Sequence, residues 1–206
     1  MTAREPILNP VAVAELRPTQ ITVGYREVEE KRKRFHAMSE RAGQTFLGRH
    51  LIPCVLGPKD RHYIIDNHHL ARALHEDGVE SVLVSVTADL SRLTKAAFWT
   101  FLDNRAWCHP YDRHGERVGF EAIPTAVAKL EDDPYRSLAG ELRGAGGYAK
   151  DLTPFAEFLW ADFLRRRIKA KTIAADFDAA LAKALELARS PHADFLPGWC
   201  GPHNRT

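Results

Sequence analysis

The sequence has few cysteines and no long apolar run, and these two absences exclude several classes of protein. Its three cysteines, Cys54, Cys108 and Cys200, are odd in number and lack Cys-x-x-Cys spacing. This argues against both a disulfide framework and a cysteine zinc site. No apolar stretch approaches the roughly 20 residues of a membrane-spanning helix, and the opening residues show no secretory signal. We therefore expect no membrane partner and a cytoplasmic location.

A large surplus of charge of one sign is also absent. The 29 basic and 27 acidic residues leave a net charge of +2 at pH 7, well short of the basic surplus expected of a dedicated duplex-DNA binder. A nucleic-acid partner is permitted by this balance but is not required. The ten histidines are compatible with an enzyme, because imidazole titrates near neutral pH and is a common metal ligand.

Short apolar runs separated by turn residues predict a small sheet in the first half of the chain. Residues 52–56 and 63–65 flank a Gly-Pro-Lys-Asp-Arg turn and are expected to be neighbouring strands. Residues 82–86 are rich in β-branched side chains and predict a third strand. A charged surface helix is expected over residues 26–35, and another helix is expected to begin at residues 89–91.

The second half of the chain has a helical pattern. The Asp-Pro pair at residues 133–134 predicts a capped helix start, and Gly144 is suited to close that helix. A Thr-Pro pair at residues 153–154 repeats the start signal and opens a largely apolar helix over residues 155–168, which we expect to be buried. A last amphipathic helix is expected over residues 176–188.

The length of 206 residues is sufficient for one small α/β domain with a helical companion. We predict the fold class α/β (α+β), with an α/β domain over residues 1–110. A helical extension over residues 111–206 is expected to pack over the cleft of that domain.

The segment over residues 63–74 runs from a strand directly into a helix, through the turn Asp66-Asn67-His68-His69. The N–H groups at the start of a helix favour anions, so this turn predicts an anion site. Asp66 beside two imidazoles adds a general base, or a metal site made by Asp66 and His68. The alternative is that Asp66 only caps the helix and the histidines lie on the surface.

The turn at residues 66–69, followed by Ala-Leu, resembles the Asp-Gly-His-His-Arg turn of the ParB/sulfiredoxin superfamily, in particular its stand-alone "ParB-like nuclease" branch. The likeness covers about residues 16–86. In that superfamily the turn and the helix N-terminus hold nucleotide phosphates. Its members include CTP-binding partition proteins, ATP-dependent sulfinic acid reductases and free-serine kinases. The resemblance therefore implies a ParB/sulfiredoxin-like α/β domain that binds a nucleotide.

The chain departs from the family pattern at two positions of this turn. Asn67 replaces glycine, which is tolerable because Asn accepts left-handed backbone geometry better than most residues. Leu70 replaces the arginine that faces phosphate, so Arg72 or a more distant basic residue would have to supply that charge. The kinases also use an early glutamate, for which Glu27 is the candidate. Lys31 shares its helical face and either lines the cleft with it or forms a surface ion pair.

Further candidates lie in the second half of the chain. Arg136 and Arg143 share a helical face and precede a glycine-rich loop and Lys150, so they either embrace a phosphate or carboxylate or are solvated charges. Glu157 falls in an apolar helix, where an ionised carboxylate needs a partner. The basic run at residues 165–171 either contacts nucleic acid or complements a helix dipole.

The preferred hypothesis is a nucleotide- or phosphate-handling enzyme, either a phosphotransferase or a nucleotide hydrolase acting on a small molecule. Magnesium with ATP, ADP or CTP would be its cofactor set. The catalytic candidates are Asp66, His68, His69 and Glu27. The phosphate- or substrate-binding candidates are Asn67, Arg72, Lys31, Arg136, Arg143 and Lys150.

Two alternatives belong to other functional classes. In a metal-dependent nuclease, Asp66, His68 and His69 would activate water, and residues 165–171 would hold the nucleic-acid backbone. In a partition-type DNA-binding module there would be no chemistry at all. The sequence shows no helix-turn-helix pattern that would favour this last alternative.

Overall fold

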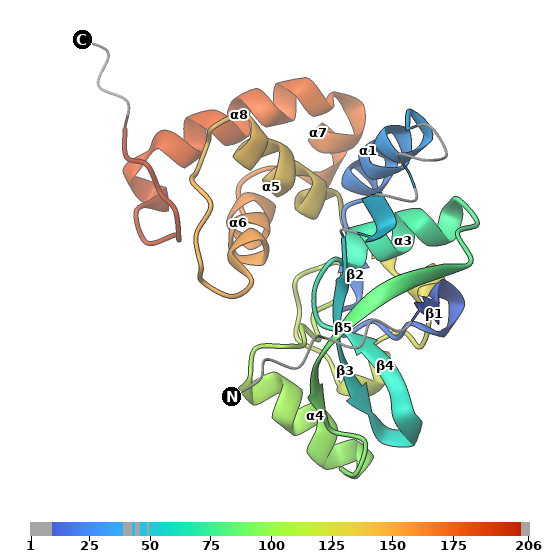
Figure 1. The fold of residues 1–206 in the computed structure, drawn as a ribbon. Coiled ribbons are helices and arrows are strands. Elements are labelled where there is room, and N and C mark those ends of the chain that lie inside the picture. The colour runs from blue at the N-terminus through green and yellow to red at the C-terminus, as the bar shows by residue number, and fades with distance from the viewer. Residues whose placement is uncertain (1–9, 39–42, 44–45, 49, 203–206) are drawn as a thin grey trace, which may run out of the picture. The chain divides into compact units, whose positions relative to one another are not determined.

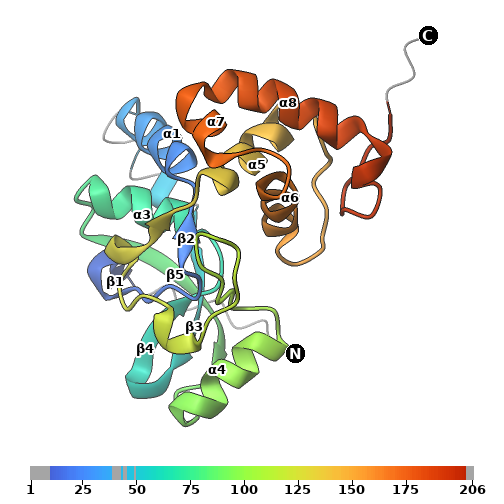
Figure 2. The ribbon, with the colours of Figure 1, turned by 180° about the vertical axis from the view of Figure 1, so that it is seen from behind.

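The computed structural model of the chain describes residues 10–38, 43, 46–48 and 50–202. By its internal contacts the chain divides into two compact units (Figures 1 and 2). The first unit contains Met1–Thr22 and Val28–Glu131, and the second contains Val23–Glu27 and Asp132–Thr206.

This division differs from the boundary that we expected at residue 110. Residues 111–131 belong to the first unit, where Ile123 is buried in the same hydrophobic cluster as Val55 and Phe98. The short segment Val23–Glu27 belongs to the second unit. There the backbone N–H of Tyr25 donates to Asp132 Oδ1 over 2.9 Å. Such distant pairings are not visible in local sequence patterns.

The first unit is built around a four-stranded sheet with the strand order β1-β5-β3-β4. The strands are β1 (Pro10–Ala12), β3 (Ile52–Gly57), β4 (Arg61–Ile64) and β5 (Ser81–Asp89). Strand β5 runs parallel to β3 and antiparallel to β1, and β3 and β4 form an antiparallel hairpin. The three strands expected from the apolar runs are confirmed, and β5 is longer than the sequence indicated.

The helices α1 (Tyr25–His36), α3 (His68–Glu76) and α4 (Lys95–Asn104) accompany this sheet. The first turn of α1 belongs to the second unit and the remainder to the first. The expected start of α4 at residues 89–91 is wrong, because β5 continues to Asp89. The helix is capped instead by Thr94, whose Oγ1 accepts the N–H of Ala97 over 3.3 Å.

The second unit consists of helices that surround α5 (Pro134–Gly144). This helix contacts α6 (Ala156–Arg165), α7 (Ala170–Ala175) and α8 (Phe177–Arg189) (Figure 2). Asp133 caps α5 by accepting the N–H of Tyr135 over 3.0 Å, as the Asp-Pro pair predicted. Trp160 is fully buried in the core of this unit and stacks on Tyr148 at 4.4 Å between ring centroids.

Helix α6 departs from its sequence prediction at both ends. Its cap is Phe155 in the left-handed conformation (φ 59°), without a side-chain hydrogen bond, so Thr153 does not cap it. The helix ends at Arg165 rather than at residue 168. The helix is buried along one face only: Trp160 is inside, whereas Leu159 is exposed.

The chain passes between the units at a small two-stranded sheet, formed by β2 (Thr22–Val23) and β6 (Glu131–Asp132). The N–H of Glu131 donates to Ile21 over 3.0 Å, and the N–H of Asp133 donates to Val23 over 2.9 Å. The first of these hydrogen bonds lies within the first unit, and the other lies within the second unit. Within the part of the chain that the structure describes, no helix is long and apolar enough to cross a membrane.

Gly57 at the end of β3 provides a test of the packing in the first unit. A methyl group at this position would lie 2.5 Å from the Tyr63 ring and 2.8 Å from the Phe98 ring. Gly57→Ala is therefore expected to lower the free energy of unfolding by about 1–3 kcal/mol, because both rings must move. Urea unfolding followed by tryptophan fluorescence measures this loss.

Gly144→Ala is the matched control, because nothing lies within 4 Å of its added methyl group. We expect its stability to equal or exceed that of the parent chain. Equal stability of the two variants would contradict the close packing at Gly57.

Candidate functional site

The turn between β4 and α3 has the left-handed geometry that its sequence predicts. Asn67 adopts φ 61° and ψ 29° and forms the N-cap of α3, without a side-chain hydrogen bond to the helix. Its backbone N–H donates to Asp66 Oδ1 over 2.7 Å. Asp66 therefore orders the turn itself rather than capping a helix N–H. Both residues are exposed, whereas the first turn of α3, which begins at His68, is buried.

His68 holds the start of α3 in place. Its side chain is buried, at 4% exposure, and Nε2 accepts the backbone N–H of Thr19 over 3.1 Å. The hydroxyl of Thr19 donates to the carbonyl of Ile64 at the end of β4 over 2.8 Å. With Nε2 as an acceptor, the ring proton of neutral His68 lies on Nδ1. His69 is also buried, so the alternative that both histidines lie on the surface is wrong.

Among the residues that the structure describes, no group of three or more His, Cys, Asp or Glu side chains is placed to hold a metal ion. Asp66 and His68 thus lack a third ligand of these types within the described chain. A metal held by these two residues stays a prediction.

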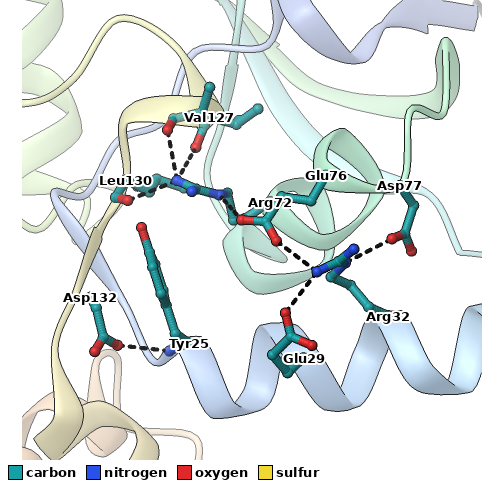
Figure 3. Close-up of polar contacts among 10 residues, drawn as sticks. Tyr25, Glu29, Arg32, Arg72, Glu76, Asp77, Val127, Leu130 and Asp132 are labelled. Atoms are coloured by element: carbon teal, nitrogen blue, oxygen red, sulfur yellow. Dashed lines mark hydrogen bonds and ion pairs between the residues drawn. The ribbon is translucent and has the colours of Figure 1, made fainter.

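Arg72 forms a set of contacts that the sequence did not indicate (Figure 3). Its Nη1 donates to the carbonyls of Val127, Ala128 and Leu130 over 3.4, 2.7 and 2.9 Å. Its Nε donates to Glu76 Oε1 over 2.7 Å. This guanidinium ties the segment before β6 to α3. The geometry therefore supports a structural role for Arg72 and lends no support to the expected phosphate contact.

A neighbouring network joins α1 to the end of α3. Arg32 Nε lies 2.7 Å from Asp77 Oδ1, and Arg32 Nη1 lies 2.7 Å from Glu29 and 3.2 Å from Glu76 (Figure 3). The hydrogen bonds that Arg32 donates to the carboxylates of Asp77 and Glu29 raise its pKa. The charged residues on this part of α1 thus hold the helix against the end of α3. Lys31 lies beside it in the first unit, whereas Glu27 belongs to the second, and a shared role for the two stays a prediction.

The second unit contains a buried arginine. Arg136 on α5 is only 5% exposed, and its guanidinium carbon lies 3.5 Å from the centroid of the Phe158 ring. Its Nε and Nη1 are buried and have no hydrogen-bond partner among the described residues. Burial lowers the pKa of Arg136, and the carboxylates of Glu157, Asp133 and Glu27 oppose that shift. The alternative that this residue is a solvated charge is therefore wrong.

Two glutamates approach the middle of α5 close to this arginine. Glu27 Oε2 and Glu157 Oε1 each lie 3.6 Å from the position that a Cβ atom on Gly140 would take. Glu157 also pairs with the partly exposed Arg143, with Oε1 and Nη1 3.2 Å apart. Its carboxylate thus has the basic partner that its apolar helix required. Lys150 is exposed on the loop that follows.

The basic run after α6 is partly engaged in the fold. Arg165 pairs with Asp133 and Asp162, and Arg167 Nη1 donates to the carbonyl of Phe163 over 3.1 Å. Burial raises the pKa of Asp133, while the charge of Arg165 acts in the opposite direction. Two cations of the run therefore stabilise the second unit, which weakens its use as a nucleic-acid surface.

The fold and its turn define a ParB-like protein. Residues 9–166 match the model of the family described as "Putative ParB-like nuclease", and the chain belongs to this family, which confirms the resemblance. It is similar to the crystal structure of protein Atu1540 from Agrobacterium tumefaciens, with 53% sequence identity and a TM-score of 0.91. The match covers 97% of this chain and 99% of that one. No curated protein matches the chain.

The structural role of Arg72 can be tested through stability. Arg72→Met removes the donors to the three carbonyls and is expected to lower the free energy of unfolding by about 1–3 kcal/mol. Urea unfolding measures the change, with Arg61→Met, an exposed arginine of the same unit, as the control. An Arg72 whose only role is to bind a ligand would leave the unfolding free energy of the unliganded protein unchanged.

Proposed function

We propose that this ParB-like chain is an enzyme that handles a nucleotide or another phosphorylated small molecule, with the phosphate bound at the start of α3. The observation that carries this proposal is the left-handed Asn67 immediately before His68–Glu76. The N-terminus of α3 therefore has no side-chain cap. N–H groups at a helix start, reinforced by the helix dipole, are a recurring phosphate site.

The residues around the turn suit phosphoryl transfer or nucleotide hydrolysis. Asp66 is exposed, and the N–H of Asn67 orients its carboxylate, so Asp66 can accept a proton from an attacking hydroxyl group or water. The same carboxylate fits magnesium, which proteins commonly hold through one or two carboxylates together with substrate phosphates. When bound, the ion would neutralise phosphate charge. His68, held by Thr19, is assigned to positioning the turn.

Nucleotide binding by the turn can be tested with two variants of Asn67. Isothermal titration calorimetry with ATP, ADP and CTP, with and without magnesium, is expected to give binding by at least one of them. Asn67→Val should weaken it at least tenfold, because a β-branched residue is strained in the left-handed conformation. Asn67→Gly should retain it, because glycine adopts this conformation freely.

Circular dichroism of both variants checks that each remains folded. A parent protein that is folded but binds none of the three nucleotides would exclude nucleotides as its ligand. Equal binding by the two variants would exclude the turn as the site.

A metal-dependent nuclease is the second candidate, and the description of the family supports it. The exposed carboxylate of Asp66 would then help to activate water on a bound metal. Asp66→Asn is expected to abolish metal-dependent cleavage of supercoiled plasmid, whereas Asp60→Asn, an exposed residue of the β3–β4 turn, should retain it. Plasmid that stays intact with the parent protein in magnesium and in manganese would eliminate this candidate.

A further inference from the structure

We propose that the second unit contains a separate binding site for a small molecule that carries a carboxylate or phosphate group. The site is formed by Arg136, by Glu27 and Glu157, and by the open position at Gly140. It does not depend on the α3 turn, because all four residues belong to the second unit.

The unpaired donors of Arg136 are the first observation behind this site. Both Nε and Nη1 are buried, and within the part of the chain that the structure describes neither has a hydrogen-bond partner. Leaving a buried donor without an acceptor is unfavourable, and more so for a charged group. Phe158 lies against the guanidinium face and so restrains its plane. An oxyanion that accepts hydrogen bonds from these donors would recover the cost of burying them.

The carboxylates near Arg136 are already engaged elsewhere. Asp133 accepts the N–H of Tyr135 and pairs with Arg165. Glu157 pairs with Arg143. These carboxylates attract Arg136 through space but form no hydrogen bond with its Nε or Nη1. Among the described residues these two donors thus have no acceptor, which an oxyanion from outside the chain would supply.

Gly140 is the second observation. Glycine inside a helix is less favourable than alanine, yet a Cβ atom here would make only ordinary contacts, 3.6 Å from each of the two glutamate oxygens. Neither a clash nor a left-handed backbone requires glycine at this position. The missing methyl group leaves room in front of both carboxylates.

The charges of the site specify the chemistry of its ligand. Arg136 would bind an oxyanion, while Glu27 and Glu157 would accept hydrogen bonds from a donor on the same molecule. The two carboxylates repel a simple anion, so a small polar molecule with an oxyanion and one or more hydroxyl groups suits the site better than inorganic phosphate alone.

Three probes of similar size separate these contributions. Glycerate offers a carboxylate with hydroxyl groups, glycerol 3-phosphate offers a phosphate with hydroxyl groups, and glycerol offers no anion. Calorimetry with the full chain is expected to show binding of glycerate or glycerol 3-phosphate and none of glycerol. Preference for one anion identifies the group that Arg136 recognises. A parent protein that binds neither anion, or binds glycerol equally well, overturns the proposal.

Variants locate the binding on α5. Arg136→Met and Gly140→Ala should each weaken the binding of the preferred probe at least tenfold. Gly140→Ala should also keep or raise the thermal midpoint, because alanine favours the helix. Gly144→Ala on the same helix is the matched control and should bind like the parent. Unchanged binding in Gly140→Ala overturns the proposal, even if Arg136→Met fails to fold.

Asn67→Val distinguishes this site from the α3 turn. Binding of the preferred probe should be the same in Asn67→Val as in the parent, whether or not nucleotide binding is lost. Loss of probe binding in that variant would assign the probe to the turn and would contradict a separate site in the second unit.

Discussion

The hydrogen bonds from Arg72 to the carbonyls of Val127, Ala128 and Leu130 are the constraint that fixes the end of the first unit. They hold the segment before β6 against α3, and Glu131 then donates its N–H to Ile21. Asp133, two residues further on, caps α5. One guanidinium and the backbone hydrogen bond of Glu131 thus fix the path of the chain up to the end of the first unit.

Arg72 and Arg136 show two different outcomes for a guanidinium removed from water. Arg72 donates to fixed carbonyl oxygens and to Glu76, so its desolvation is offset within the fold. Arg136 has aromatic contact and attractive carboxylates, but its Nε and Nη1 have no acceptor. Buried donors normally have hydrogen-bond acceptors, so the unpaired donors of Arg136 are consistent with a ligand that supplies those acceptors. This contrast, rather than the number of basic residues, separates a structural arginine from a candidate binding residue.

The α3 turn combines a rigid base with an accessible end. The buried pair of His68 and Thr19 anchors the helix start, while Asp66 and Asn67 remain exposed. The two histidines of the motif are therefore part of the buried base of the turn, whereas the acidic residue beside them faces solvent. A turn of this kind can present backbone N–H groups in a fixed orientation, which is the property that phosphate recognition requires.

The sequence by itself determined the elements whose causes are local. Apolar alternation and turn residues predicted β3, β4 and β5, the Asp-Pro pair predicted the start of α5, and the tolerance of Asn for positive φ predicted the geometry at Asn67. The ParB-like family was recognisable for the same reason, since its turn is a contiguous motif. Errors at the start of α4 and the ends of α6 arose where several residues could serve as caps and packing chose among them.

Only the tertiary structure decided which distant residues meet. Segments far apart in the chain are joined by the contacts of Arg72 with the carbonyls just before β6, by the burial of Ile123 in the first unit, and by the approach of Glu27 to Gly140. A local pattern shows that an arginine lies on a helical face, but its burial and its partners depend on which other segments cover that face. Arg72 and Arg136 look equally suited to phosphate in the sequence, and their different surroundings in the fold assign them to different roles.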